Sequence, residues 1–155
     1  MKYAESTGVA VEKSKGDIER TLKRYGSKSF VCGTQENKAA VIFVLNGKRI
    51  QFVLELPKFE DYQYTPSRRK KRSPDEQIKE HEQACRQKWR ALLLIIKAKL
   101  EAVESGIATL DEEFMAYTLL PNGQTVAKWM IPQIENVYST HQMPPLLPFY
   151  DDEKR

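Results

Sequence analysis

The stretch AAVIFVLNGKRIQFVL, residues 39–54, decides the fold of this chain. Two runs rich in β-branched and aromatic residues flank Asn46-Gly47, a dipeptide that favours a two-residue type I′ turn because both positions require a positive φ. The turn fixes the register of an antiparallel hairpin in which Phe43 lies opposite Ile50. One face of the hairpin is expected in the core and carries Val41, Phe43, Ile50, Phe52 and Leu54. The other face is only half apolar and carries Ile42, Val44, Arg49, Gln51, Val53 and Glu55.

A short helix and a third strand are expected before the hairpin. Ser14-Lys15-Gly16-Asp17 resembles a capping box with Ser14 as the N-cap, and an apolar stripe at spacings of four and three follows it. These signals predict a helix over residues 15–25. The run Phe30–Gly33 predicts a strand that joins the hairpin through the polar turn at residues 35–38.

The sequence after the hairpin predicts a long helix. Ser73-Pro74-Asp75-Glu76 supplies an N-cap serine, a first-turn proline and an acid at N3, and neither Gly nor Pro recurs before Gly106. A helix of about thirty residues is therefore expected. Its apolar stripe has spacings of three and four and consists of Cys85, Trp89, Leu92, Ile96, Leu100 and Val103. Apolar residues 93–95 widen this stripe, which indicates a helix at the centre of the core.

Two further helices are expected toward the C-terminal end. A capping box at Thr109–Glu112 opens the first of them, and a turn at residues 120–123 follows. The last helix is predicted over residues 125–139, with a kink at Pro132. The residues that this helix is expected to bury are Val126, Trp129, Met130, Ile134 and Val137. The proline-rich run Met143–Pro148 is expected to lie extended against the body.

Together these elements predict one α+β domain, in which a three-stranded antiparallel sheet packs on a long central helix, with a short N-terminal helix and two further C-terminal helices. The length of 155 residues is typical of one domain. Its expected parts are an αβββ part at 14–57, a mobile basic loop at 58–73, a helical part at 74–148 and a tail at 149–155. No apolar run reaches the ~18 residues of a membrane span, and the first residues lack a secretory signal, so a cytoplasmic protein is expected.

The basic run Arg68-Arg69-Lys70-Lys71-Arg72 is the most unusual feature of the sequence. The net charge of +4 is mild, but five adjacent cations could neutralise several phosphates and release counterions. Tyr62 and Tyr64 could stack on unpaired bases. Basic residues that would extend this surface if the fold brought them to the same side are Lys48, Arg49, Arg86 and Arg90. The alternatives are a charge run that serves solubility or partner binding, and aromatic residues that pin the linker to the core.

The order of helix, strands and helix invites comparison with two known modules. The PD-(D/E)XK nuclease core needs an acid and a lysine on the strand that here carries Gln51 and Val53, so that enzyme is rejected. Double-stranded RNA-binding domains share the αβββα order, but here the basic run precedes the second helix, which itself opens with acids. The similarity to both modules is therefore topological only.

No other residues predict catalysis, a bound metal or a cofactor, and a non-enzymatic protein is expected. His81 and His141 are interpreted as isolated, without the neighbours that a zinc site needs. Cys32 and Cys85 are interpreted as reduced, buried thiols, although a disulfide between them stays open. The carboxylate pairs at helix starts are explained by capping and the helix dipole.

The stretches Trp89–Val103, Asp111–Phe114, Leu120–Val126 and Met143–Pro148 resemble a family of small uncharacterised proteins encoded by tailed bacteriophages and prophages. The resemblance spans residues 14–148 and supplies no catalytic or binding residues. It implies a phage gene product that acts in the bacterial cytoplasm, in DNA replication or recombination or against host defence.

Three hypotheses about function follow. The first is a nucleic-acid-binding accessory protein whose basic loop contacts phosphates. The second is a protein-binding inhibitor of a host defence or replication protein, motivated by Ile42, Val44 and Val53 on the half-apolar sheet face. The wide apolar surface of the long helix also favours a homodimer. The third is a sponge that binds a nucleotide signal between the sheet and the basic face of the long helix.

Overall fold

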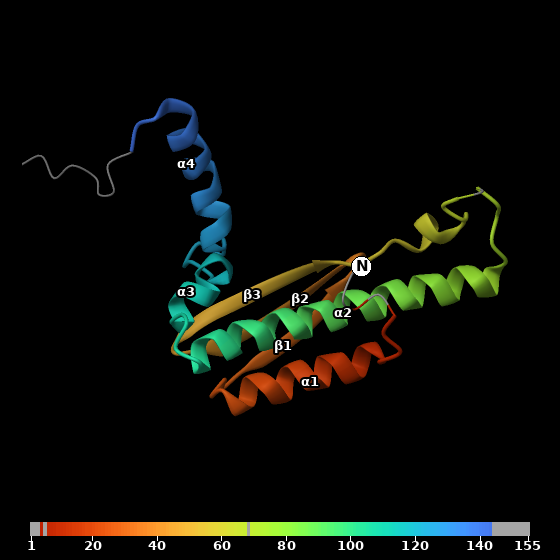
Figure 1. Ribbon diagram of the computed structural model, residues 1–155, viewed down its shortest axis with the longest axis horizontal. Helices are drawn as coiled ribbons and strands as arrows, with labels where there is room; N and C mark the ends of the chain where they lie inside the picture. Colours follow the sequence, from red (N-terminus) through yellow and green to blue (C-terminus); the bar gives the residue numbers. More distant parts are fainter. Residues whose placement is uncertain (1–3, 5, 68, 144–155) are drawn as a thin grey trace, which may run out of the picture.

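The computed structural model describes residues 4, 6–67 and 69–143, and Figure 1 shows how their elements are arranged. In chain order these are α1 (Val11–Arg24), β1 (Phe30–Gln35), β2 (Lys38–Leu45), β3 (Lys48–Glu55), η1 (Phe59–Tyr62), α2 (Pro74–Glu104), α3 (Leu110–Phe114), η2 (Met115–Tyr117) and α4 (Val126–Thr140). The predicted α+β architecture is confirmed: an antiparallel sheet of order β1-β2-β3 packs on a long helix.

The hairpin between β2 and β3 has the predicted turn and register. Asn46 and Gly47 both have positive φ, at 48° and 74°, which is the requirement of a type I′ turn. Leu45 therefore pairs with Lys48, and Phe43 pairs with Ile50. β1 adds antiparallel to β2, so β1 and β3 form the two edges of the sheet.

The core lies between one face of the sheet and the helices α1 and α2. Alternate residues of β2 are buried, as a strand with one covered face requires. The sheet and the two helices together bury Ile18, Leu22, Ala39, Val41, Phe43, Leu45, Ile50, Phe52, Trp89, Leu92, Leu93, Ile96 and Leu100. Phe114 of α3 closes the core with its ring edge-on to Phe43, at a centroid distance of 6.0 Å.

Helix α2 is the longest element and has the predicted start. The Ser73 hydroxyl accepts from the Glu76 amide, while the Glu76 carboxylate accepts from the Ser73 amide, which completes a capping box. The helix has 31 residues and is about 46 Å long at 1.5 Å per residue. It therefore runs the length of the sheet and continues past it toward the segment that carries the basic run (Figure 1).

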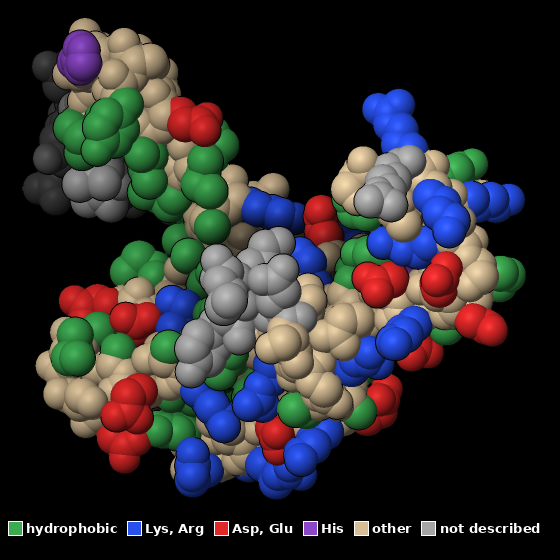
Figure 2. Space-filling view, turned by 45° about the vertical axis from the view of Figure 1, so that its right-hand side comes forward, with side chains coloured by type: hydrophobic (Ala, Val, Ile, Leu, Met, Phe, Trp, Pro, Cys, Tyr) green, Lys and Arg blue, Asp and Glu red, His purple; other side chains and the backbone are tan. Residues whose placement is uncertain are grey.

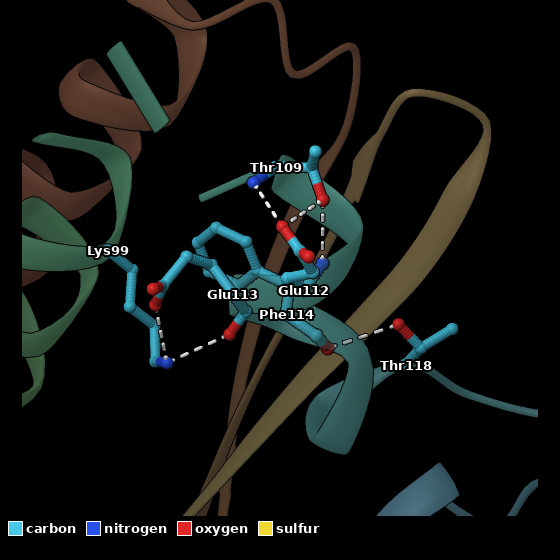
Figure 3. Close-up of polar contacts among 6 residues, drawn as sticks. All are labelled: Lys99, Thr109, Glu112, Glu113, Phe114 and Thr118. Carbon is cyan, nitrogen blue, oxygen red and sulfur yellow. Dashed lines mark hydrogen bonds and ion pairs between the residues drawn. The ribbon is translucent and has the colours of Figure 1, made fainter. Parts of the chain in front are cut away.

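Helix α3 is joined to the last turns of α2 by polar contacts, which Figure 3 shows. Lys99 Nζ donates to the Glu113 carbonyl oxygen at 2.8 Å and forms an ion pair with its carboxylate at 3.1 Å. The capping box between Thr109 and Glu112 fixes the start of α3, as predicted. α3 and the η2 turn therefore form a stable corner at the C-terminal end of α2.

Helix α1 begins four residues earlier than the sequence pattern predicts, and the assignment of Ser14 as its N-cap is wrong. Ala10 is the N-cap, and no side chain caps this helix end. Ser14 lies one turn inside the helix and is fully buried. It occupies the inward-facing stripe of α1, one turn before the buried Ile18.

Helix α4 forms where predicted, with Thr125 as its N-cap, but the expectation that it buries an apolar stripe is wrong. None of its residues is buried, and Trp129 is 51% exposed. The corner formed by α3 and η2 already closes the core, and α4 projects away from the layers of the body (Figure 1). Pro132 lies inside the continuous helix. The predicted extended run from Pro144 and the tail lie outside the described residues.

Candidate nucleic-acid interface

The segment of residues 62–72, called here the basic hairpin, folds back on itself. The Thr65 amide donates to the Lys70 carbonyl at 2.8 Å, and the Arg72 amide donates to the Gln63 carbonyl at 2.9 Å. Tyr64 and Lys71 form an antiparallel bridge between the two arms. These bonds hold the described part of the basic run in a defined loop. Arg68 lies outside the described residues, and the predicted mobility of the loop stays a prediction.

Arg72 points into the hairpin. Its Nη1 atom donates to the carbonyl oxygens of Tyr62 at 3.0 Å and of Tyr64 at 2.6 Å. The guanidinium thereby satisfies backbone acceptors that the loop geometry leaves unpaired. Arg72 therefore stabilises the loop, whereas Arg69, Lys70 and Lys71 are exposed to solvent.

The two tyrosines have different surroundings. Tyr62 is half-buried with its ring against His81, at a centroid distance of 5.8 Å, and burial raises the pKa of its phenol. Phe59 contacts the same imidazole, so these two rings pin the linker to α2. Tyr64 is 50% exposed and faces solvent beside Lys71. Of the two predicted stacking residues, Tyr64 is therefore the accessible one.

Acidic residues lie close to the hairpin. The hydrogen bonds from Ser73 hold the pKa of the Glu76 carboxyl below its usual range, and the charges of Lys70 and Arg72 lower it further. Residues 58–80 contain seven Lys/Arg and five Asp/Glu. Figure 2 shows basic side chains projecting from the lobe at the upper right, with acidic side chains beneath them. The exposed cations of the basic hairpin therefore have several carboxylates as neighbours.

Lys48 and Arg49 lie at the opposite end of the molecule. They belong to the tight turn of the β2–β3 hairpin, where Lys48 forms an ion pair with Asp111 beside the C-terminal end of α2. The basic hairpin precedes the N-terminal end of the same helix, which is about 46 Å long. The fold therefore does not bring these two groups together (Figure 1).

Arg86 and Arg90 lie along the middle of α2 and are half-buried. The Arg86 guanidinium donates to Gln83 Oε1 at 2.9 Å and forms an ion pair with Glu82 at 3.5 Å. At 1.5 Å per residue Arg86 is roughly 18 Å from the start of the helix. Neither residue adjoins the basic hairpin.

His81 is not isolated, because its Nε2 lies 3.7 Å from Cys85 Sγ, one helical turn away. The i, i+4 spacing of the two residues was the available sequence signal. This pair does not form a nucleophile and base. Nε2 also lies 2.9 Å from the Pro57 carbonyl oxygen, which can only accept, so Nε2 carries a proton. Burial raises the pKa of the Cys85 thiol, which disfavours the reactive thiolate.

Cys32 and Cys85 are both free, so no disulfide joins them, and both are half-buried rather than buried as expected. Burial raises the pKa of Cys32 as it does that of Cys85. Among residues 4, 6–67 and 69–143, no cluster of three or more His, Cys, Asp or Glu could hold a metal ion. Within the same ranges no helix combines the length and apolar character needed to cross a membrane.

No protein-family model, curated protein or solved structure matches this chain.

Proposed function

We propose that this protein binds nucleic acid without catalysis, through the basic hairpin. The observation that carries the proposal is the geometry of the hairpin, in which Arg72 bonds inward to the backbone while Arg69, Lys70 and Lys71 face solvent beside the exposed ring of Tyr64. The proposed site is smaller than the sequence suggests and leaves out Lys48, Arg49, Arg86 and Arg90, which the fold places elsewhere.

The chemistry of this site favours single strands. Three exposed cations can each neutralise a phosphate, and counterion release then supplies most of the affinity. An exposed tyrosine ring offers a stacking surface only to a base that is not already paired, and such stacking contributes about 1–3 kcal/mol per base. The first turn of α2 offers little to a phosphate, because Pro74 has no amide hydrogen and the amides of Glu76 and Gln77 already donate to Ser73.

A titration of fluorescently labelled single-stranded DNA, followed by anisotropy, tests the proposal. Three phosphate contacts predict a slope of log K against log salt near −2, which is a loss of roughly 20-fold between about 50 and 200 mM salt. The triple variant R69S/K70S/K71S should abolish binding, whereas K13S/K28S/K38S, a matched change of charge at other exposed lysines, should leave it intact. Equal losses in both variants, or no binding at low salt, would refute the site.

The Tyr64→Ala variant separates stacking from charge. We expect it to weaken single-stranded binding by about tenfold or more, as the loss of one base–aromatic stack predicts, and to leave the salt slope unchanged. Binding to a duplex should not change, because duplex bases have no free face for the ring. Equal weakening toward both forms of DNA would contradict the stacking role.

A second candidate function, protein binding, is favoured by the uncovered face of the sheet. Val31 is 60% exposed on this face, where it pairs with Ile42, and Val53 is also exposed. An apolar sheet face of this kind fits a host defence or replication protein as partner, in the phage context that the sequence resemblance suggests. Affinity capture from nuclease-treated bacterial lysate tests this function: a captured protein that Val53→Asp releases would support it, and a capture that yields no protein partner would exclude it.

A further inference from the structure

Helix α4 has an apolar surface that the described residues leave largely open to solvent. Trp129 is 51% exposed and Tyr138 is 77% exposed, and Ile131 and Ile134 are also exposed. The space-filling view shows hydrophobic side chains along this lobe at the upper left, with few charged ones among them (Figure 2). Side chains of this size on a helix are normally packed against another element.

The base of α4 is fixed, so the exposure of the helix follows from bonded structure. The Val126 amide donates to the Thr118 carbonyl at 2.9 Å, and Thr118 itself bridges to Ile50 of β3. The Leu119 amide donates to the Arg49 carbonyl at 2.8 Å. These bonds tie the entry of α4 to the sheet edge and direct the helix outward (Figure 1).

The positions on the apolar face of α4 have the same spacing when counted from either end of the helix. At 3.6 residues per turn, one face carries Val126, Trp129, Met130, Gln133, Ile134 and Val137, of which Trp129 and Ile134 are exposed and the other four are half-buried; Ile131 and Tyr138 lie to one side of this face. The spacing 126, 130, 133, 137 is symmetric about a point between residues 131 and 132. An antiparallel copy of the helix aligned on that point therefore places Val126 opposite Val137, Trp129 opposite Ile134, and Met130 opposite Gln133.

We propose that α4 pairs antiparallel with α4 of a second copy of this chain, which gives a two-fold symmetric dimer. A two-fold interface requires one patch to be complementary to itself, and the symmetric pattern meets that requirement. The charged residues of the helix, Lys128 and Glu135, fall on the opposite face and balance each other. No like charges therefore meet across the proposed contact.

The charge of α4 also argues against a membrane surface as the partner that covers its apolar face. Helices that lie in the membrane interface carry several Lys or Arg residues on their polar face, which attract anionic lipids. The polar face of α4 has one lysine, offset by one glutamate. Its apolar face, from Val126 to Val137, is about 17 Å long, which suits a small helix pair and predicts a dimer of moderate affinity.

Cysteine cross-linking tests both the pairing and its direction. In the antiparallel alignment the two Val126 positions are about 17 Å apart along the axis, whereas Val126 of one copy faces Val137 of the other. A mixture of Val126→Cys and Val137→Cys chains should therefore form a disulfide-linked heterodimer under mild oxidation, and Val126→Cys alone should not link to itself. Glu135→Cys, on the opposite face, and the unmodified chain are the controls.

Sedimentation velocity supplies an independent readout. We expect the wild-type protein to change from monomer to dimer with a dissociation constant of about 10–100 µM, and Trp129→Ser/Ile134→Ser to remain monomeric with unchanged circular dichroism. A wild-type protein that stays monomeric well above this range would overturn the proposal. Self-linking of Val126→Cys would overturn the antiparallel alignment, and linking of Glu135→Cys as fast as the mixture would overturn the assigned face. None of these outcomes depends on nucleic-acid binding.

Discussion

Replacing Ser14 by alanine is expected to stabilise the protein. The Ser14 side chain is fully buried between α1 and α2, and its Oγ has no hydrogen-bond partner among the described residues. An unsatisfied buried hydroxyl costs about 1–3 kcal/mol, because the group loses its bonds to water and gains none. Alanine removes this cost at nearly unchanged volume and has the higher helix propensity, by up to about 0.5 kcal/mol.

The expected gain in the free energy of unfolding for Ser14→Ala is therefore about 1–3 kcal/mol. For a chain of 155 residues this gain corresponds to a rise in the melting temperature of roughly 3–10 °C, since each kcal/mol shifts it by about 2–4 °C. Urea unfolding monitored by circular dichroism measures the change, with an unchanged slope showing that the unfolded state is unaffected. Ser139→Ala, at an exposed helical serine whose hydroxyl donates to the Asn136 carbonyl, is the control and should show no comparable gain. Destabilisation by Ser14→Ala would mean that the hydroxyl is bonded in the native state, and the reasoning would fail.

Three more outcomes are expected. Trp89→Ala should lower the free energy of unfolding by about 3–5 kcal/mol, because the indole is in the core, whereas Trp129→Ala, measured at low protein concentration, should lower it by less than about 1 kcal/mol. Equal losses in chemical unfolding would contradict the exposed placement of α4. The bonds from Ser73 lower the pKa of the Glu76 carboxyl below its ordinary 4.5, so they stabilise the fold above pH 4.5, and this stability is lost as the pH falls through the lowered pKa. Glu76→Gln should therefore reduce the fall in stability at acid pH, and an unchanged fall would show that the bonds do not form. Arg72→Ala should accelerate tryptic cleavage in the basic hairpin several-fold, since the bonds that hold its backbone are lost; an unchanged rate would show that Arg72 does not hold the loop.

The elements that the sequence predicts well are those determined by neighbouring residues. Asn46-Gly47 selects the turn, and the turn sets the whole register of the β2–β3 hairpin. The capping boxes at Ser73 and Thr109 likewise depend on four consecutive residues, so both are confirmed. The central place of α2 follows from the length and width of its apolar stripe.

The errors concern what each element packs against, which neighbouring residues do not determine. Residues 14–17 offer Ser14 as a cap, but α1 already begins at Val11 and Ser14 is one of its buried residues. For α4, the periodicity correctly indicates an amphipathic helix and says nothing about which molecule covers its apolar face. The predicted site contains too many residues for the same reason. Lys48 and the basic hairpin lie at opposite ends of α2, and only the structure shows how far this helix separates them.

The length of α2 also determines how the two ends of the molecule influence each other. At physiological ionic strength the field of a surface charge decays over about 8 Å, so the ~46 Å of α2 spans more than five such screening lengths. Charge brought to the basic hairpin is therefore not felt electrostatically at the corner of α3 and α4, and a large ligand at one end leaves the other end sterically free. The helix is a rigid spacer, so the proposed nucleic-acid contact at the basic hairpin and the proposed contact of α4 with a second copy do not compete for space.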